Sequence, residues 1–199
     1  QTGDPSGWDR NYLLIKTQSR GLSSIVIKDD NYSGWQGFLE VEVSYLVESN
    51  QSWIQLGSDI EGEAAGDYSG TEVSLDSDGD RVAISAYINS GGGANAGHVR
   101  VYEYSNGSWS QLGSDIDGEA AGDKSGIHIS LDSDGDRVAI GSAHNDDNGT
   151  NAGHVRVYEY SSGSWSQLGA DIDGEAAHDS FGGAVSLSSD GYRVAIGAQ

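Results

Sequence analysis

The chain has no cysteine among its 199 residues, so disulfide bonds and cysteine nucleophiles are both excluded. Basic side chains are scarce, since 10 Lys and Arg stand against 31 Asp and Glu and the formal net charge is −21. That balance argues against binding to nucleic acid or to anionic membrane surfaces, which require basic patches. No apolar run approaches the length needed to span a bilayer, so we expect no membrane insertion.

Motifs of catalysis are missing as well. There is no His-Glu-Xaa-Xaa-His, no histidine cluster and no nucleophile elbow, and serine and aspartate are too abundant for a Ser-His-Asp pairing to carry information. We therefore expect a protein that is not an enzyme. His98 and His154 each follow a glycine at the start of a predicted strand, where we expect an exposed or hydrogen-bonded imidazole. Proline occurs once, whereas 30 glycines spaced among Val, Ile and Tyr indicate tight turns between strands.

A repeat of 56 residues organises the chain. The segment Gly97–Ala152 recurs almost word for word from Gly153, and Trp53, Trp109 and Trp165 keep the same step. Units start near residues 41, 97 and 153, and the last unit is incomplete. Self-similarity at such a period is typical of one supersecondary unit that is stacked several times.

Each unit contains four short segments with strand character. In the first full unit they are 71–75, 81–84, 98–102 and the segment around Trp109, and Asn106-Gly107 between the last two is a strong hairpin signal. Four antiparallel strands per repeat describe a propeller blade. The sequence therefore predicts an all-β, propeller-like array of about three four-stranded antiparallel blades over residues 37–199. We expect the three repeated tryptophans to pack in the core or between blades.

Residues 1–36 do not repeat and form a predicted N-terminal β arm. The arm is neutral, with four acidic and four basic residues, and strands are predicted at 11–17 and 24–29. Trp8 and Trp35 could anchor the arm in a groove of another subunit or stack on sugar rings, and we favour anchoring. The residues that we expect to serve assembly are Trp8, Tyr12, Leu13, Leu14, Ile15, Ile25, Val26, Ile27 and Trp35.

The segment 181–198 resembles the FG-GAP repeat, the blade unit of integrin-alpha-type propellers. Phe181-Gly182 and Gly197-Ala198 stand at the two ends that name the motif, and the other copies are looser. The array is also similar to Gly/Asp-rich repeat proteins of aquatic microbes and algae. The resemblance implies a propeller-like, extracellular protein with an adhesive or structural role, and it implies no activity.

Two acidic loops recur and are candidate cation sites. The first carries Asp76, Asp78 and Asp80 in one copy and Asp132, Asp134 and Asp136 in the next. Alternate carboxylates around a glycine can wrap calcium, and FG-GAP blades hold calcium in a loop at this place, but Ser-Asp-Gly is also plain turn chemistry. The second loop, 115–123, recurs in each unit, which favours a connection between blades over a weak cation site.

Four Asn-Xaa-Ser/Thr sequences are candidates for N-glycosylation, at Asn31, Asn50, Asn106 and Asn148. The alternative is that Asn-Gly-Ser serves only as hairpin-turn chemistry in a serine-rich chain. Glycosylation would require a secreted protein.

About three blades are too few to close a ring, and the incomplete last unit predicts an unpaired strand edge. We expect the arm of one subunit to complete the sheet of the next, which gives a head-to-tail polymer. The expected function is an extracellular structural protein, the protomer of a self-assembling fibre or surface coat. The alternative is a calcium-dependent adhesin or a glycan-binding propeller module that recognises glycans or cell-surface proteins. If the sequence is a piece of a longer array, further blades would close the ring instead.

Overall fold

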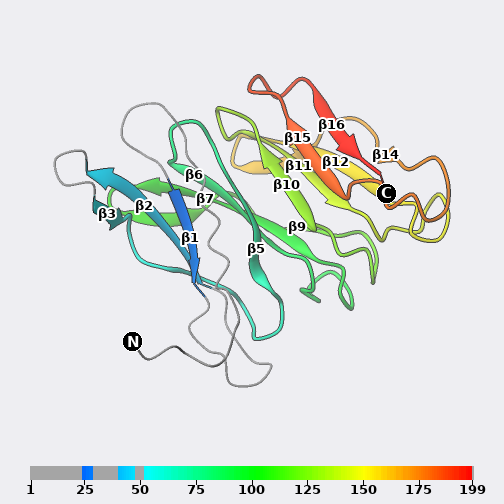
Figure 1. Cartoon of the computed structure of the whole chain (residues 1–199), viewed down its shortest axis with the longest axis horizontal. Helices are drawn as coiled ribbons and strands as arrows, with labels where there is room; N and C mark the ends of the chain where they lie inside the picture. Colours follow the sequence, from blue (N-terminus) through cyan, green and yellow to red (C-terminus); the bar gives the residue numbers. More distant parts are fainter. Residues whose placement is uncertain (1–23, 29–39, 48–51, 199) are drawn as a thin grey trace, which may run out of the picture.

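A computed structural model gives the architecture of the chain (Figure 1), and it describes the backbone of residues 24–28, 40–47 and 52–198 and the side chains of residues 53–198. Of the predicted features, the strand at 11–17 and Trp8, Trp35, Asn31 and Asn50 lie outside the described residues. The part of the chain described here is all-β and contains no helix, hence none long and apolar enough to cross a membrane. The strands in order are β1 (Ser24–Lys28), β2 (Glu40–Val47), β3 (Ser52–Gln55), β4 (Ile60–Glu61), β5 (Ser69–Leu75), β6 (Arg81–Ala86), β7 (His98–Ser105), β8 (Ser108–Gln111), β9 (Ile116–Asp117), β10 (His128–Leu131), β11 (Arg137–Ser142), β12 (His154–Ser161), β13 (Ser164–Gln167), β14 (Ile172–Asp173), β15 (Ala184–Leu187) and β16 (Val194–Gly197).

The two central sheets are near copies, which we call the second and third blades. The second blade has the strand order β5-β6-β7-β8, with the short β9 also paired to β7. The third blade repeats this order as β10-β11-β12-β13, with β14 paired to β12. Equivalent residues pair in both, for example Tyr104 with Trp109 and Tyr160 with Trp165. The prediction of four antiparallel strands per repeat is confirmed.

The outer sheets contain different parts of the unit. The first sheet has the order β1-β2-β3, with β4 paired to β2, and the last sheet contains β15 and β16. The predicted strand at 24–29 is confirmed as β1, and Ile25, Val26 and Ile27 pair with Val43, Glu42 and Val41 of the same chain. On β2, the strand β1 takes the side that β6 takes on β7. Figure 1 shows the four sheets following one another from the N-terminal to the C-terminal end of the array.

The hairpin between β7 and β8 explains how the sequence sets the strand register. Asn106 and Gly107 have φ angles of 52° and 88°, which is the conformation of a two-residue type I′ turn. Ser162 and Gly163 form the equivalent turn between β12 and β13, with φ of 54° and 87°. Both turns place the tryptophan of the unit opposite a tyrosine, so each blade presents the same aromatic pair.

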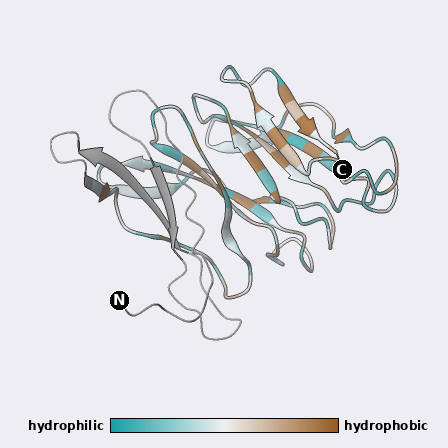
Figure 2. Ribbon diagram, viewed as in Figure 1, coloured by the Kyte–Doolittle hydropathy of each residue, from teal (hydrophilic) through white to brown (hydrophobic). Residues whose placement is uncertain are grey.

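The hydrophobic core lies between blades. One cluster joins Val99, Val101 and Ile116 of the second blade to Leu131 and Ile140 of the third, and a smaller one surrounds Ile60 and Val82. Figure 2 shows the hydrophobic residues along the strands and the hydrophilic ones in the connecting loops. Each blade therefore buries its apolar face against its neighbour, as the repeat predicts.

Hydrogen bonds tie successive blades together at one repeat of separation. The Ser77 amide donates to the Ser133 carbonyl at 3.0 Å, and the Ser133 amide donates to the Ser189 carbonyl at 3.1 Å. The Leu131 amide donates to Ser74 Oγ at 2.9 Å, and the same bond recurs between the next pair of blades at 3.0 Å. The junctions between blades are thus copies of one another.

Candidate functional site: an open blade face and two charged junctions

A tryptophan from each blade packs on a leucine–glycine pair of the blade before it. Trp109 Nε1 donates to the Leu56 carbonyl at 2.7 Å, and Trp165 Nε1 donates to the Leu112 carbonyl at 2.8 Å. In both blades a tyrosine packs against the indole, with 5.2 Å between ring centroids. The prediction that the repeated tryptophans pack between blades is confirmed for Trp109 and Trp165. We call each leucine–glycine pair with its aromatic partners a tryptophan seat.

The glycine of the seat shows how closely the indole approaches. A Cβ atom on Gly57 would lie 3.0 Å from Trp109 Cδ1, and one on Gly113 would lie 3.1 Å from Trp165 Cδ1. Gly169 is the next residue in this series, and no heavy atom of the described residues would lie within 4 Å of its Cβ. The third seat therefore has its leucine–glycine pair, Leu168–Gly169, but no tryptophan of the described residues packs on it, and we call it the open seat.

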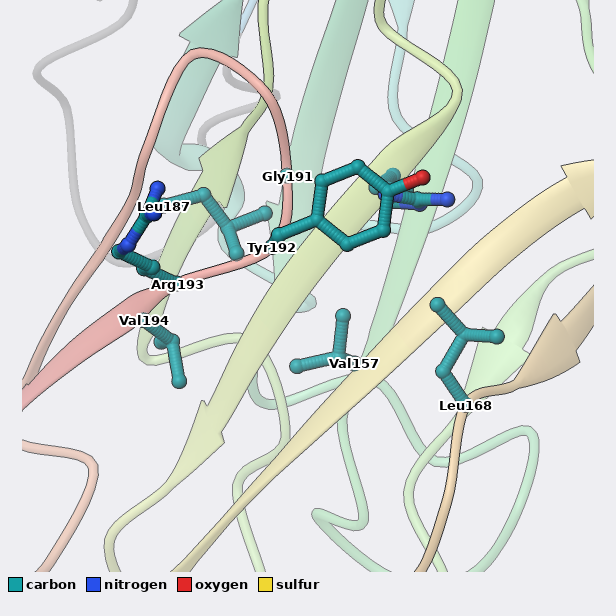
Figure 3. A pocket seen from close by; sticks show the side chains of 8 residues that line it. Val157, Leu168, Leu187, Gly191, Tyr192, Arg193 and Val194 are labelled. Atoms are coloured by element: carbon teal, nitrogen blue, oxygen red, sulfur yellow. The ribbon is translucent and has the colours of Figure 1, made fainter.

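Side chains around the third seat are correspondingly exposed. Leu168 is 40% exposed and Ile172 is 38% exposed, whereas Ile116, the counterpart of Ile172 at the occupied junction, is 5% exposed. A mostly apolar groove of about 310 Å³ lies here between the third blade and the last sheet (Figure 3). It is lined by Arg137, Val157, Leu168, Leu187, Gly191, Tyr192, Arg193 and Val194.

Tyr192 forms one wall of the groove. It stands where the earlier units have an aspartate, its ring lies 4.2 Å from the guanidinium carbon of Arg137, and it is 77% exposed. Figure 3 shows its ring near the valine and leucine side chains of the groove. A cation–π contact of this kind holds the ring in place.

On the first sheet, the first tryptophan of the repeat series is exposed. Trp53 is 41% exposed and Ile54 is 44% exposed, so within the described part of the chain the first tryptophan of the series is not seated. The prediction that the repeated tryptophans pack between blades is therefore confirmed for Trp109 and Trp165 and not for Trp53.

The first acidic loop is the hairpin between β5 and β6. Asp76 is buried, and its Oδ1 accepts the amides of Gly79 at 2.7 Å and Arg81 at 3.2 Å. Burial, together with a smaller contribution from neighbouring Asp80, raises the pKa of Asp76 to about 6. Burial also raises the pKa of Asp132 in the next copy. These contacts are those of the turn that the sequence predicts.

The predicted calcium ligands do not converge as a set. Among the described residues, the groups of three or more His, Asp or Glu side chains with mutually close ligand atoms lie elsewhere, at the blade junctions. Asp78, Asp80, Asp134 and Asp136 belong to neither group. Calcium binding by these hairpins stays a prediction.

The first charged junction lies between the first sheet and the second blade. Arg100 donates to both carboxylate oxygens of Asp115 at 2.8 Å and also pairs with Glu63. The Arg100 guanidinium lowers the pKa of Asp115, and burial lowers the pKa of His98. His98 Nδ1 lies 3.6 Å from Asp115 Oδ2.

The second charged junction repeats this arrangement one unit later. Arg156 donates to both oxygens of Asp171 at 3.0 Å and pairs with Glu119. His154 Nδ1 lies 3.6 Å from Asp171 Oδ2, and Asp147 adds a fourth side chain. All four ligand atoms lie within 4.8 Å of one another.

Both repeated histidines are buried, which corrects the expectation for one of them. His98 is 3% exposed and His154 is 1% exposed. His154 Nδ1 is fully buried and has no hydrogen-bond partner among the described residues. The expectation of an exposed or hydrogen-bonded imidazole is wrong for this atom, because the connection after β14 packs against the start of β12 and Asp171 Oδ2, at 3.6 Å, is too far away to accept a hydrogen bond.

The predicted blade-connecting loop 115–123 does join two blades. Asp123 accepts the Ala120 amide at 3.1 Å within the loop and the Asn145 side-chain amide of the third blade at 3.2 Å. The cation site considered for this loop includes Glu119 in this copy and Asp171 at the start of the next, but it does not include Asp147 or His154. The available signal was Asp147, which replaces Gly91 between otherwise similar units.

Two candidate glycosylation residues lie in the described part. Asn106 is exposed at the tip of the β7–β8 hairpin. Asn148 is also exposed, and its side-chain amide donates to the Gly174 carbonyl at 2.6 Å. Both positions are accessible, and glycosylation stays a prediction for each.

Comparison with known proteins identifies the fold alone. No family model matches the chain, and no curated protein is similar to it in sequence. A Bacteroides uniformis structure, provisionally assigned as a 6-phosphogluconolactonase, is 13% identical with a TM-score of 0.51 and is matched over 87% of this chain. A second such structure, from Bacteroides fragilis, is 13% identical with a TM-score of 0.49 and is matched over 94% of this chain. The chain spans about half of each protein, 47% and 51% of their lengths. The first of these similarities and the strand order of the two central sheets together give the chain a propeller-like fold of antiparallel four-stranded blades.

Proposed function

We propose that the chain is an extracellular structural protein that assembles head to tail, with the first sheet of one subunit completing the last sheet of the next. The observation that carries this proposal is the open tryptophan seat at Leu168 and Gly169. It repeats the two seats that hold Trp109 and Trp165. Trp53, the exposed tryptophan of the same repeat series, lies at the opposite end of the array and is the side chain that we expect to fill it.

The backbone of the last sheet supports the same docking. β16 is the counterpart of β6, which pairs with β5 on one side and β7 on the other, and among the described strands β16 pairs with β15 alone. A strand of the β7 type would extend this sheet by main-chain hydrogen bonds. β2 is the strand of that type in the first sheet, and its hairpin partner β3 carries Trp53. Insertion of β2 and β3 beside β16 would bring Trp53 to the open seat.

Docking in this way requires an exchange of strands. In a single chain β1 occupies the edge of β2 that the neighbour's β16 would use. One short antiparallel pairing replaces another, so the backbone contribution nearly cancels and burial of the Trp53 indole supplies the gain. The donated element is then the β2–β3 hairpin rather than the N-terminal arm, residues 1–36, expected from sequence. Contacts of this head-to-tail type generate filaments or rings.

The remaining features fit an exposed, non-catalytic scaffold. We assign the repeats to the FG-GAP type on Phe181-Gly182 and Gly197-Ala198, and with that type we propose an extracellular location. The large negative charge, and glycans on Asn106 and Asn148, would keep the sides of such a polymer solvated. Most charged clusters recur in both full blades, whereas a single catalytic centre would need residues that differ between blades.

Two variants test the proposal because each removes one end of the contact. Trp53→Ala removes the donor, and Leu168→Glu places a charge in the seat. Each variant alone is expected to be monomeric, and an equimolar mixture should form a one-to-one dimer, since each partner keeps one intact end. Ser166→Glu is the matched control, because Ser110, its counterpart beside an occupied seat, is exposed. Light scattering over a concentration series and electron microscopy provide the measurement.

Deletion of residues 1–36 separates the β2–β3 hairpin from the arm as donor. Without β1 the edge of β2 is free, so our proposal predicts stronger assembly, whereas donation of the arm predicts monomers. A further repeat unit in the same polypeptide would fill the same groove. Because Gln199 corresponds to Ala143 of the preceding unit, the extension starts at the counterpart of His144, and adding another copy of residues 144–167 should therefore abolish assembly. A full chain that stays monomeric at every concentration would contradict self-assembly.

A further inference from the structure

We infer that Glu119, Asp147, His154 and Asp171 form a binding site for one divalent transition-metal cation of the zinc type, which joins the second blade to the third. We call these four residues the four-ligand junction. The inference does not depend on the proposed assembly, since the junction lies between two blades of a single chain.

The fold brings the four side chains together from three segments. Glu119 lies in the connection that follows β9 of the second blade. Asp147 lies in the loop between β11 and β12, His154 begins β12, and Asp171 immediately precedes β14. A cation held here would link one blade to the next through bonds that no single blade can make.

His154 supplies the observation that points to a ligand. Its side chain is 1% exposed, and its Nδ1 atom has no hydrogen-bond partner among the described residues. A buried polar nitrogen without a partner costs on the order of 1–3 kcal/mol. Nδ1 faces the carboxylates of the cluster, with Asp171 Oδ2 at 3.6 Å, which is too long for a hydrogen bond. Coordination of a cation by the Nδ1 lone pair would satisfy this atom.

The charge of the junction suits a divalent cation. Three carboxylates face one guanidinium, that of Arg156, and the four-ligand junction with this arginine carries a formal charge of −2 when His154 is neutral. Arg156 pairs with both Glu119 and Asp171 and so holds two of the carboxylates toward the histidine. Glu119 and Asp147 are exposed, which leaves a path for the ion to enter.

The donor set favours zinc over calcium. An imidazole nitrogen suits zinc and other transition metals, and zinc also accepts Asp and Glu oxygens in four-coordinate sites, whereas calcium takes 6–8 oxygens. Zinc bonds of about 2.0–2.2 Å place tetrahedral ligands about 3.4 Å apart. The ligand atoms already lie within 4.8 Å of one another, so small rotations of the exposed carboxylates would complete the shell.

The preceding junction provides a natural comparison. It has Glu63, His98 and Asp115 at the equivalent positions, but Gly91 stands where the second junction has Asp147. With two carboxylates beside Arg100, its formal charge is −1. We expect this three-ligand junction to bind the ion much more weakly, so the chain should bind one zinc ion and not two.

The test measures zinc binding to the full chain after treatment with a chelator. Titration against a fluorescent zinc indicator and isothermal calorimetry should give one site per chain, and zinc should raise the melting temperature, whereas calcium at the same concentration should not act at this site. Asp147→Gly copies the residue of the first junction and should weaken zinc binding more than about tenfold. Glu61→Gln removes one charge from an exposed residue of the first sheet that belongs to no candidate cation site, and it should leave zinc binding unchanged.

Gly91→Asp supplies the converse experiment. It completes a four-ligand set at the first junction and should raise the stoichiometry from one zinc to two. The backbone is alike at the two positions, since the amides of Gly91 and Asp147 make the same hydrogen bond to an asparagine side chain two residues earlier. A Cβ atom on residue 91 would lie 3.0 Å from Asn89 Oδ1, so this asparagine side chain must shift slightly. Absence of zinc binding, two sites in the unaltered chain, or full affinity in Asp147→Gly would each overturn the inference.

Discussion

The occupied seat at Leu112–Gly113 and the open seat at Leu168–Gly169 have the same leucine and the same left-handed glycine, with φ of 69° and 75°. They differ in what lies above them. Trp165 covers the first and donates to its carbonyl, while the second leaves Leu168 40% exposed. The place of a blade in the array therefore decides whether its leucine–glycine pair is covered, because the same pair is buried in one position and exposed in the next.

Removing the indole from an occupied seat should have the largest effect. Trp165→Ala deletes a packed indole and its hydrogen bond to Leu112, and we expect a loss of about 2–4 kcal/mol in the free energy of unfolding. Trp53→Ala, at the exposed equivalent, should cost less than about 0.5 kcal/mol in the monomer. Urea unfolding of both variants at low concentration makes the comparison. Equal losses would show that Trp53 is also seated within its own chain.

A pH experiment compares two carboxylates, Asp76 in the hairpin between β5 and β6 and Asp115 at the first charged junction. Asp76 is buried, its pKa is raised to about 6, and the last copy has Ser188 at this position. The folded state thus binds a proton more tightly than the unfolded state, whose Asp pKa is about 3.9. Asp76 therefore contributes stability below about pH 4, and this is lost as pH rises through about 6.

Asp76→Asn should remove this dependence and keep the oxygen that accepts the Gly79 and Arg81 amides. As pH rises from 4 to 7, the free energy of unfolding of the variant should increase by on the order of 1–2 kcal/mol relative to that of the unaltered chain. Asp115→Asn should behave oppositely, because Arg100 lowers the pKa of Asp115 and its stabilisation is lost as pH falls. Urea unfolding with a chelator present at several pH values measures both slopes. Parallel curves for Asp76→Asn and the unaltered chain would contradict the prediction.

The smallest expected effect concerns the hairpins that carry the two seated tryptophans. Asn106 and Ser162 occupy the same left-handed turn position, at φ of 52° and 54°, and asparagine adopts this conformation more easily than serine. Ser162→Asn should therefore stabilise the chain by about 0.5 kcal/mol. The reverse change, Asn106→Ser, should cost a similar amount. Thermal unfolding resolves the difference, and a loss in Ser162→Asn would show that the serine makes a contact of its own.

Much of the fold could be predicted from the sequence because its signals are local. The apolar run at 82–84, the alternation along 98–102, the Asn106-Gly107 turn and the repeated tryptophan specify strands and hairpins within one unit, and the recurrence of the unit specifies stacking. The open seat could be anticipated only as an unpaired edge. Its lining, from Val157 to Val194, joins two sheets and is recognisable once they pack.

The four-ligand junction shows the limit of sequence reasoning most clearly. Asp147, His154 and Asp171 are separated by loops and strands, and each alone has the appearance of an ordinary polar residue in a repeat. The calcium prediction was made instead for the hairpin of Asp76, Asp78 and Asp80, because its carboxylates alternate in the sequence. In the structure its buried carboxylate is used by the turn itself, through the Gly79 and Arg81 amides.

By itself the sequence determined the blade, its four strands, its turns and the contact that one blade makes with the next, because these depend on residues within about one repeat. Only the tertiary structure decided which copies of that contact are filled, which histidine nitrogen is buried without a partner, and which edge of β2 is occupied by β1. Each of these three features depends on residues outside the repeat unit in which it lies. A side chain is buried only when the blades pack, so its burial cannot be read from its own repeat unit.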